Sequence, residues 1–441
     1  MPTENAHQRY LAELPNSWSI CDLRALGSIV GGSTPSRAIS RFWNGNIPWV
    51  TPGEMTALVG TKFLNDTRER ITRAGYESCG TRLLPPGSLL ITTRATLGLV
   101  ALAGCEVSTN QGFKSVVFCR DNYPDFYFHL FHRLKPEMER LASGTTFLEI
   151  SAGDFGRITI PVPPPSEQRA IAAVLDTIDD AIQKTEQIIA KLQQVKQGLL
   201  HDLLTRGIDD NGELRDPERH PEQFQDSPLG RIPRGWEVLP IGSVGEVRLG
   251  KQKTPDARPS PWTRPYLRVV NIFDDRLDLR DVNEMNFSPS EFNRYALRYG
   301  DVLLTEGDLA SAHNVGRTAV FRDEIPHCCF QNSLLRFRVG EDDLPDFFHY
   351  AFSHLRVCGR FARATMSTTV FHLSAGRLSP LPIMRPPLEE QRLIAERLLL
   401  VDKHLHVERS SQDKQLALVR ALSDDLLTGR VRTTSLPEFS A

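Results

Sequence analysis

The residues best placed for catalysis form incomplete sets. Gly245 to Lys251 resembles a phosphate-binding loop, but Gln252 stands where such a loop needs the Ser or Thr that binds magnesium. His129 and His132 lie three residues apart on an expected helix and could share a metal ion, yet no cysteine or carboxylate cluster accompanies them. We therefore interpret the first segment as a strand and turn, and the two histidines as structural or surface residues.

Two carboxylates, Glu306 and Asp308, follow an expected strand, as the carboxylates of nucleases often do. A loop carboxylate can also accept a hydrogen bond from the amino group of cytosine in the major groove of DNA. The motifs of serine hydrolases, zinc proteases and dinucleotide-binding proteins do not occur in the sequence, nor does an Asn-Pro-Pro-Tyr type tetrapeptide of amino-methyltransferases. The sequence therefore favours recognition over catalysis, although for either carboxylate taken alone a solvated loop residue is the more probable interpretation.

The second half of the chain repeats the first. Leu14–Trp18 recurs as Ile232–Trp236, and Pro164–Arg169 recurs as Pro387–Arg392, with nearly the same displacement along the chain. The landmarks keep their order, so the repeat extends over both halves. Two copies of one unit indicate a pseudo-twofold molecule, which suits a ligand that itself has two similar halves.

Each copy divides into a mixed region and a helical region. Short runs rich in β-branched residues, bounded by Gly, Pro and Asn, predict strands, and helices are expected to follow them at 125–142 and 346–364. We predict an α+β fold with two pseudo-twofold-related α+β domains joined by two long antiparallel coiled-coil helices. The expected boundaries are 1–163 for the first α+β domain, 164–207 for the first heptad helix, 208–230 for an acidic linker, 231–385 for the second domain, 386–430 for the second heptad helix and 431–441 for a tail.

Both helical regions show the heptad pattern of a coiled coil, with seam positions at alternating spacings of four and three. The second seam is polar in its middle, at Glu408, Gln412 and Gln415. The most economical arrangement pairs the two helices antiparallel, and the alternative is that each folds onto its own domain or onto another protein. The predicted apolar seam residues are Ile171, Leu175, Ile178, Ile182, Ile189, Leu192, Leu199, Leu203, Ile394, Leu398, Val401, Leu405, Val419, Leu422 and Leu426.

Loops between the expected strands carry side chains that suit DNA, because Arg pairs with guanine, Asn and Gln pair with adenine, and Lys and Thr bind phosphates. The candidates in the first copy are Ser33, Arg37, Lys62, Thr93, Arg94, Asn110, Gln111, Lys114, Thr145 and Thr146. Those in the second copy are Lys251, Lys253, Arg258, Arg264, Asn271, Glu306, Asn314, Arg317, Gln331, Asn332, Thr368 and Thr369. Gln111 and Gln331 coincide when the two copies are superposed by sequence and form the strongest pair, as either a shared DNA contact or a shared structural hydrogen bond.

The composition is that of a globular protein, with 40% hydrophobic and 24% charged residues and a net charge of −2. The acidic stretch 209–226 carries much of the negative charge, so the two α+β regions are mildly basic. No apolar run reaches the roughly 20 residues that span a bilayer, and the N-terminal segment lacks the apolar core of a signal peptide. The seven cysteines show no C-x-x-C spacing, so neither disulfides nor structural zinc are expected. We expect a cytoplasmic protein with no membrane partner.

Taken together, these motifs resemble the specificity (S) subunit of type I restriction–modification systems. The resemblance rests on the Leu-Pro-x-x-Trp opening, the Gly-Ser-Thr-Pro turn at 32–35, the Ile-Pro-Trp segment at 47–49 and the helix that begins with Glu-Gln-Arg at 167–169. The second copy matches at 232–236, at 250–255 with an insertion, in degenerate form at 264–266, and at 390–392. The resemblance covers nearly the full chain.

The resemblance implies that the two α+β domains are target-recognition domains, each reading one half of a bipartite, asymmetric site in double-stranded DNA. The helices would fix the gap between the half-sites and dock two methyltransferase (M) subunits, which restriction–translocation (R) subunits join. The chain itself would be non-catalytic and hold no cofactor. S-adenosylmethionine, ATP and Mg are expected on the partner subunits.

Two hypotheses from other classes stay open at this point. The chain could be a self-sufficient DNA methyltransferase or nuclease with an unrecognised active site, which turnover by the purified chain alone would support. It could also be a coiled-coil scaffold without sequence-specific DNA binding. Weak, salt-sensitive DNA binding without sequence preference would support that reading, because nonspecific binding is mainly electrostatic.

Overall fold

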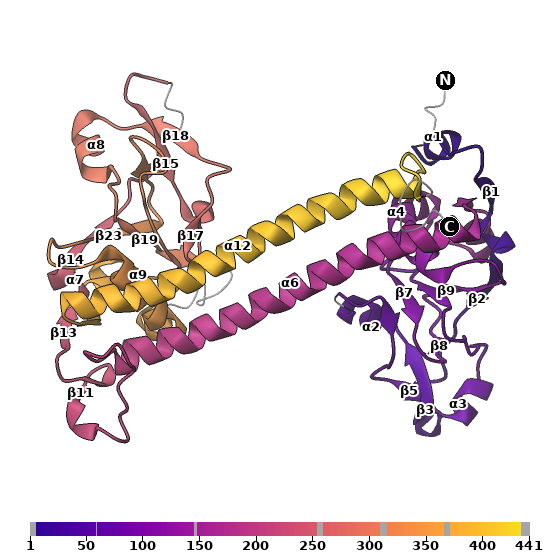
Figure 1. Ribbon diagram of the computed structural model, residues 1–441, viewed down its shortest axis with the longest axis horizontal. Helices are drawn as coiled ribbons and strands as arrows, with labels where there is room; N and C mark the ends of the chain where they lie inside the picture. Colours follow the sequence, from indigo (N-terminus) through magenta and orange to yellow (C-terminus); the bar gives the residue numbers. More distant parts are fainter. Residues whose placement is uncertain are drawn as a thin grey trace. The chain divides into compact units, whose positions relative to one another are not determined.

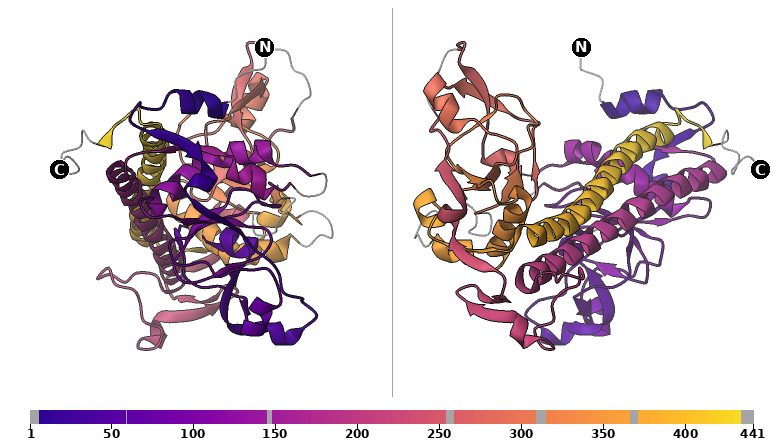
Figure 2. Two further views of the ribbon diagram at one scale, coloured as in Figure 1. Left: turned by 90° about the vertical axis from the view of Figure 1, so that its right-hand side faces the viewer. Right: turned by 60° about the vertical axis from the view of Figure 1, so that its left-hand side comes forward.

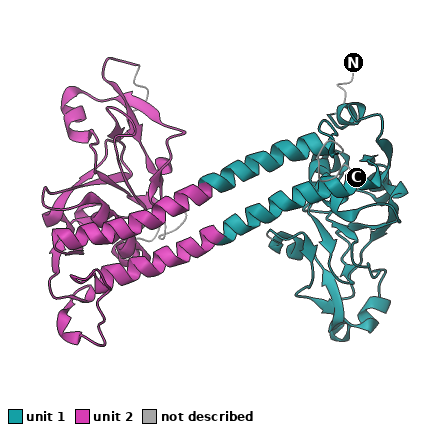
Figure 3. Cartoon of the chain, viewed as in Figure 1, with its two compact units in different colours: residues 1–187, 410–441 teal, residues 188–409 magenta. Residues whose placement is uncertain are grey.

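The computed structural model describes residues 6–58, 60–144, 148–253, 259–308, 315–365 and 371–433. The chain forms two units, unit 1 with residues 1–187 and 410–441 and unit 2 with residues 188–409 (Figure 3). Each unit combines one α+β domain with part of each long helix, α6 (Pro165–Arg206) and α12 (Leu388–Leu427). The α+β class is confirmed, and both long helices begin and end within a few residues of their expected bounds.

Unit 1 contains two main sheets, one with the strand order β2-β9-β6-β7-β4 and one with the order β5-β3-β8, and β1 pairs separately with β10 (Figure 1). Its strands are β1 (Ser19–Asp22), β2 (Gly27–Gly31), β3 (Trp43–Val50), β4 (Phe63–Leu64), β5 (Arg70–Ile71), β6 (Leu89–Ile91), β7 (Val100–Ala103), β8 (Ser108–Thr109), β9 (Lys114–Phe118) and β10 (Thr159–Val162). Its shorter helices are α1 (Ala6–Ala12), α2 (Pro52–Ala57), α3 (Arg73–Glu77), α4 (Pro124–Leu141) and α5 (Ala152–Gly156).

Helix α4 forms the centre of the unit 1 core. Phe126, Leu130 and Leu134 recur along one helix face and are buried, and they pack with Leu89 of the five-stranded sheet. A second cluster, which includes Leu90, lies where the opposite face of this sheet meets the three-stranded sheet. Because Leu89 and Leu90 point to opposite faces, the short strand β6 is buried on both sides.

Unit 2 has sheets with the orders β14-β23-β19-β21 and β18-β15-β22, and four two-stranded pairs, β11-β12, β13-β25, β16-β17 and β20-β24. Its strands are β11 (Phe224–Ser227), β12 (Gly230–Pro233), β13 (Glu237–Pro240), β14 (Gly245–Leu249), β15 (Thr263–Leu267), β16 (Ile272–Phe273), β17 (Arg276–Leu277), β18 (Asn283–Asn286), β19 (Val302–Thr305), β20 (Gly307–Asp308), β21 (Thr318–Val320), β22 (Cys329–Phe330), β23 (Leu334–Val339), β24 (Phe371–His372) and β25 (Pro382–Arg385). Its shorter helices are α7 (Ile241–Val244), α8 (Pro289–Tyr295), α9 (Pro345–Val357), α10 (Arg360–Ala364) and α11 (Ala375–Leu378).

The two units share one topology, which confirms the repeat read from the sequence. The order β2-β9-β6-β7 matches β14-β23-β19-β21, and β5-β3-β8 matches β18-β15-β22. Helices α4 and α9 occupy equivalent places in the chain, although the helix expected over 346–364 is interrupted, because Gly359 adopts a left-handed conformation with φ 69° between α9 and α10. Unit 2 has no counterpart of β4 among its described residues and carries the β16–β17 hairpin instead.

Within each unit the two long helices run antiparallel and lie side by side (Figures 1 and 2). In unit 1, Ile171 of α6 shares a core cluster with Leu426 of α12, and Gln412 donates a hydrogen bond to Glu186 at 3.1 Å. In unit 2, Leu203 shares a cluster with Ile394, and Lys196 forms an ion pair with Asp402 at 2.5 Å. Every predicted seam residue is buried or half-buried, as a packed seam requires.

Among the described residues, no helix is both long enough and apolar enough to cross a bilayer.

Candidate nucleic-acid interface

Three loops of unit 1 meet at the turn that precedes β9. The backbone N–H of Ser33 donates to Thr109 at 3.0 Å, and that of Thr93 donates to Gly112 at 2.7 Å. Gln111 lies on the same turn, where its side chain accepts a hydrogen bond from the Thr34 hydroxyl. The structure therefore brings together polar residues that are far apart in the sequence.

Charged side chains lie beside this turn. Arg94 and Lys114 each approach the carboxylate of Glu149 at 3.6 Å. Lys114 is largely buried, with a side chain 12% exposed, whereas Arg94 is 42% exposed. Two cations share one carboxylate, so this edge of unit 1 carries a local positive charge that suits DNA.

Arg37 lies over two tryptophans next to the same loops. Its guanidinium carbon is 4.0 Å from the ring centre of Trp43 and 5.1 Å from that of Trp49, and Trp49 donates a hydrogen bond to the Ser33 carbonyl at 3.1 Å. Arg37 also binds Glu69, and this hydrogen bond lowers the pKa of the Glu69 carboxyl below its ordinary value. The Arg37 side chain is 56% exposed, so it stays accessible.

Lys62 occupies a different place, between α4 and α6. Its ammonium contacts Asp125 at 2.5 Å and Asp176 at 2.7 Å, and its side chain is 16% exposed. Burial lowers the pKa of Lys62, but the hydrogen bonds to the two carboxylates outweigh burial and raise it overall. Lys62 therefore holds the α+β domain against the long helix.

Unit 2 places the same loops by the same backbone hydrogen bonds. Lys251 N–H donates to Phe330 at 3.1 Å, as Ser33 donates to Thr109, and Glu306 N–H donates to Ser333 at 2.9 Å, as Thr93 donates to Gly112. The loop framework is thus shared by the two units while its side chains differ.

This correspondence corrects the pairing of Gln111 with Gln331. The Asn110 N–H donates to Val50 at 3.0 Å, and the Gln331 N–H donates to Leu267 at 2.9 Å in the matching position. Gln331 is therefore equivalent to Asn110, and Gln111 is equivalent to Asn332. The sequence superposition placed Gln331 one position away from its structural equivalent, because the displacement between matching residues changes slightly along the chain.

Glu306 is the most distinctive residue of this region in unit 2. Glu306 occupies the position in unit 2 that Thr93 occupies in unit 1. The Leu373 N–H donates to the Glu306 carbonyl at 2.7 Å, and the Ile150 N–H donates to the Thr93 carbonyl at 3.0 Å. Glu306 is 1% exposed, and its carboxylate lies 3.0 Å from the imidazole of His372. Burial raises the pKa of Glu306, and His372 only partly offsets this.

Several other predicted residues of unit 2 take part in local structure. The Lys251 ammonium contacts Glu291 at 2.8 Å, and the buried Asn271 donates two hydrogen bonds to Asp278 and Asp281, both at 2.8 Å. Arg264 and Arg317 lie over Phe292 and Phe273, whereas Lys253 is exposed. The predicted residues Thr145, Thr146, Arg258, Asn314, Thr368 and Thr369 lie outside the described residues.

The residues considered for catalysis have structural places. His129 contacts Asp176 of α6 at 2.8 Å, and no group of three metal-binding side chains occurs in the described part of the chain. Gly245 to Leu249 forms β14, the edge strand of a sheet, in place of a phosphate-binding loop. The sequence interpretation of this segment as a strand is confirmed.

The two repeated motifs bind each other, a contact that the sequence alone did not predict. Trp18 of the opening motif donates its indole N–H to Glu167 of the Glu-Gln-Arg motif at 2.9 Å, and Trp236 donates to Glu390 at 2.9 Å. An arginine completes each site, Arg432 at 2.7 Å from Glu167 and Arg215 at 2.5 Å from Glu390. We call each set of Trp, Glu and Arg a helix-start latch; the repeated spacing of Trp and Glu was its only signal.

Comparison with known proteins identifies the family. The sequence profile described as "Type I restriction modification DNA specificity domain" matches residues 15–194 and 233–415. The chain belongs to this family. Its two matches coincide with the two copies of the repeat, and the family supplies the DNA specificity of type I systems without being catalytic itself.

Individual relatives carry the same description. The chain is 29% identical over 243 residues to the MjaIX specificity subunit of Methanocaldococcus jannaschii, covering 54% of each chain. It is 22% identical over 445 residues to the MjaVIII specificity subunit of the same organism, covering 98% of this chain and 97% of the relative. The fold resembles that of the type I S subunit from M. genitalium, with a TM-score of 0.57, 14% identity and coverage of 94% and 97%.

Proposed function

We propose that this specificity chain reads a bipartite DNA site, with one half-site read by each unit. The observation that carries the proposal is the shared loop framework with different side chains. The same backbone hydrogen bonds position Thr93 in unit 1 and Glu306 in unit 2. Two units built alike but carrying different polar groups would bind two similar DNA segments of different sequence.

The accessible members of the predicted set are the proposed DNA contacts. Those in unit 1 are Ser33, Arg37, Arg94, Asn110 and Gln111, and those in unit 2 are Lys253, Arg264, Arg317, Gln331 and Asn332. Lys114 is set aside because its side chain is only 12% exposed. Glu306 is added although it is buried, because its partner His372 is 52% exposed and displacement of that side chain would uncover the carboxylate. Lys62, Lys251 and Asn271 are set aside because carboxylates and carbonyls already occupy their polar groups. Thr93 positions the turn through its backbone.

The proposed complex contains two M subunits docked on the long helices, joined by R subunits. The support is the family and the duplicated architecture, because two copies of one unit offer two equivalent docking surfaces. The chemistry of methylation and cleavage would then belong to these partners, with S-adenosylmethionine, ATP and Mg bound there.

The experiment introduces one substitution in each unit, separately, in the cell that produces the protein. The methylated adenines of the genome are then mapped. Glu306→Gln replaces an acceptor suited to cytosine with an amide suited to adenine, so it should change one position of one half-site. Arg94→Gln should change a position of the other half-site and leave the first intact. Methylation without a bipartite motif, or a change in both half-sites from one substitution, would contradict the proposal.

A further inference from the structure

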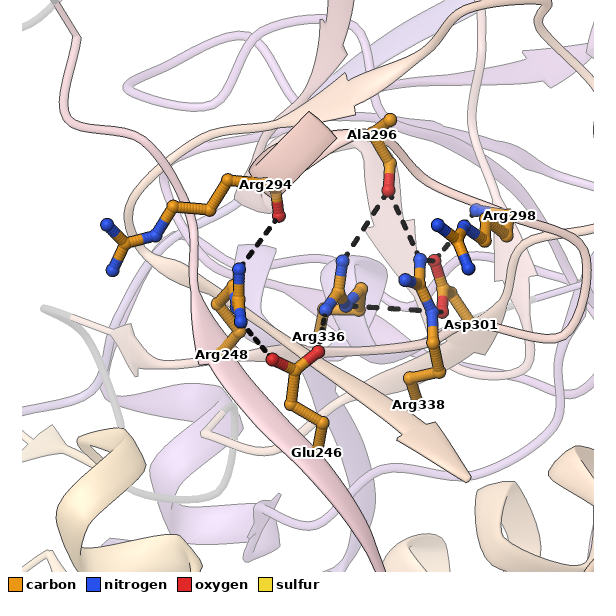
Figure 4. Close-up of polar contacts among 8 residues, drawn as sticks. All are labelled: Glu246, Arg248, Arg294, Ala296, Arg298, Asp301, Arg336 and Arg338. Atoms are coloured by element: carbon orange, nitrogen blue, oxygen red, sulfur yellow. Dashed lines mark hydrogen bonds and ion pairs between the residues drawn. The ribbon is translucent and has the colours of Figure 1, made fainter. Parts of the chain in front are cut away.

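One face of the four-stranded sheet in unit 2 carries a cluster of five arginines (Figure 4). Alternate residues of β23 and β14, such as Phe337, pack in the core with α9, so Arg336, Arg338 and Arg248 lie on the opposite face of the sheet. The other two members are Arg294, in the last turn of α8, and Arg298, in the segment between α8 and β19. The arginine cluster is defined as Arg248, Arg294, Arg298, Arg336 and Arg338.

Three members of the arginine cluster are bound to two carboxylates. Arg338 donates two hydrogen bonds, both at 2.7 Å, to Asp301, whose side chain is 1% exposed. Arg336 and Arg248 both bind Glu246. These contacts, with a hydrogen bond of 3.2 Å from Arg338 to the Ala296 carbonyl, hold the segment before β19 against the sheet, so these three arginines have a structural role.

The other two members have no such role. Arg294 and Arg298 are exposed, and neither forms an ion pair with a carboxylate in the part of the chain that the structure describes. Figure 4 shows the guanidinium of Arg294 directed away from Glu246, while its carbonyl accepts a hydrogen bond from Arg248 at 3.4 Å. Five arginines against Glu246 and Asp301 leave a surplus of three positive charges.

Arg336 lies at the buried centre of the arginine cluster, between Glu246 and Asp301. Its side chain is 1% exposed, and within the described part of the chain its Nε atom has no hydrogen-bond partner, since Nε is 4.0 Å from the nearest Asp301 oxygen. Burial lowers the pKa of Arg336. The carboxylates of Asp301 and Glu246 offset this only in part, because the like charges of Arg338 and Arg248 lower the pKa further. An additional anion near this face would be favourable.

Among the described residues of unit 1, the equivalent face of the sheet has no counterpart of the arginine cluster. The β2–β9 ladder, in which Gly27 pairs with Phe118, matches the β14–β23 ladder, in which Gly245 pairs with Val339. In this register Ser115 takes the place of Arg336, and the places of Arg338 and Arg248 are taken by Val117 and Val30. Unit 1 adopts the same fold without these arginines, so the fold does not require the surplus of positive charge.

We propose that the arginine cluster binds the sugar–phosphate backbone of the DNA half-site that unit 2 reads, and that unit 1 lacks such a site. This inference rests on the proposed function. Guanidinium groups match phosphate oxygens in geometry and charge, and such contacts position DNA without reading its sequence. In a chain with a net charge of −2, a local surplus of three positive charges is the type of surface that attracts a polyanion.

The test compares two double variants of the full chain with matched changes in charge. Arg294→Gln with Arg298→Gln removes the two exposed members of the arginine cluster. The control, Arg363→Gln with Arg377→Gln, removes two exposed arginines of α10 and α11, whose buried residues pack in the core on the α9 side. Binding of a fluorescent random-sequence duplex is measured at several salt concentrations, and each protein is also used to select sequences from a random duplex pool.

We expect the arginine-cluster variant to bind about tenfold more weakly at low salt and to lose nearly two units from the slope of log affinity against log salt. It should select the same motif as the wild type, and the control should match the wild type in every assay. Three outcomes would each overturn the assignment to phosphate and leave the proposed function intact. The arginine-cluster variant could keep the DNA affinity and salt slope of the wild type, the control could lose as much affinity, or the variant could select a different motif. If the wild type selects no bipartite motif, the proposed function fails, and this inference with it.

Discussion

At the scale of single residues, position in the fold decides whether a polar side chain is available to DNA. Lys62 and Arg94 are both cations that sequence inspection selects, yet Lys62 is buried between two carboxylates while Arg94 is 42% exposed. Thr93 and Glu306 occupy the same backbone site but offer a hydroxyl and a carboxylate. We therefore propose that specificity depends on a few positions whose backbone is held by the same hydrogen bonds in both units and whose side chains differ.

A buried histidine makes the stability of unit 2 depend on pH. His354 is 7% exposed, and burial, assisted by His201 and Arg360, lowers its pKa to about 4. The unfolded chain binds this proton near pH 6.5 and the folded chain only near pH 4, so the stability that neutral His354 contributes is present above pH 6.5 and is lost as pH falls toward 4. The loss approaches about 3 kcal/mol at the low end of this range.

The variant His354→Phe should remove this pH dependence, because phenylalanine keeps the ring but does not titrate. We expect the melting temperature of the wild type to fall more steeply between pH 6.5 and 4 than that of the variant, as measured by calorimetry of the full chain. His220→Phe is the control, since His220 is exposed in the linker and should leave the wild-type slope intact. If the melting temperatures of His354→Phe and the wild type fell in parallel with pH, His354 would not be the source of the pH dependence.

At the scale of elements, the helix-start latches explain why two separate motifs recur together. Each long helix begins where its glutamate accepts the indole N–H of a tryptophan from the start of the α+β domain. The glutamine that follows binds the domain again, since Gln168 accepts from Tyr123 at 2.8 Å and Gln391 accepts from Leu344 at 2.9 Å. The repeated motif thus anchors each helix to its domain.

Removing one latch should destabilise unit 2. Glu390 is 7% exposed and accepts hydrogen bonds from Trp236, Arg215 and the Ile208 N–H, so Glu390→Ala leaves buried donors and a cation without their partner. We expect the free energy of unfolding to fall by about 3 kcal/mol, measured by urea denaturation with tryptophan fluorescence. The neighbouring Glu389, 79% exposed, provides the control Glu389→Ala, which should cost less than about 1 kcal/mol. If Glu390→Ala and Glu389→Ala lowered the free energy of unfolding equally, the helix-start latch would not contribute to stability.

In the whole chain, α6 and α12 each contribute residues to both units, so both helices connect the two units. We propose that their length sets the unspecified gap in the DNA site. One heptad inserted into both helices keeps the seam in register and adds about 10 Å, or about three base pairs at 3.4 Å each. The methylation motif of the producing cell should then show a gap longer by about that amount.

The matched control inserts seven Gly and Ser residues after Glu218, in an exposed part of the linker. This insertion lengthens the chain without lengthening either helix, so the gap should keep its wild-type length. A gap unchanged by the heptad insertions, with methylation retained, would mean that the helices do not measure the site.

The repeat, the α+β class, the long helices with their seams and the family can be predicted from the sequence, because periodicity and motif order are properties of the linear chain. Which polar residues meet is known only from the folded chain. The tertiary structure shifted the Gln331 equivalence to Asn110, placed Lys62 and Asn271 in structural contacts, and revealed the arginine cluster. Those outcomes depend on ladder register and on contacts between residues distant in the chain, and residue type does not encode either.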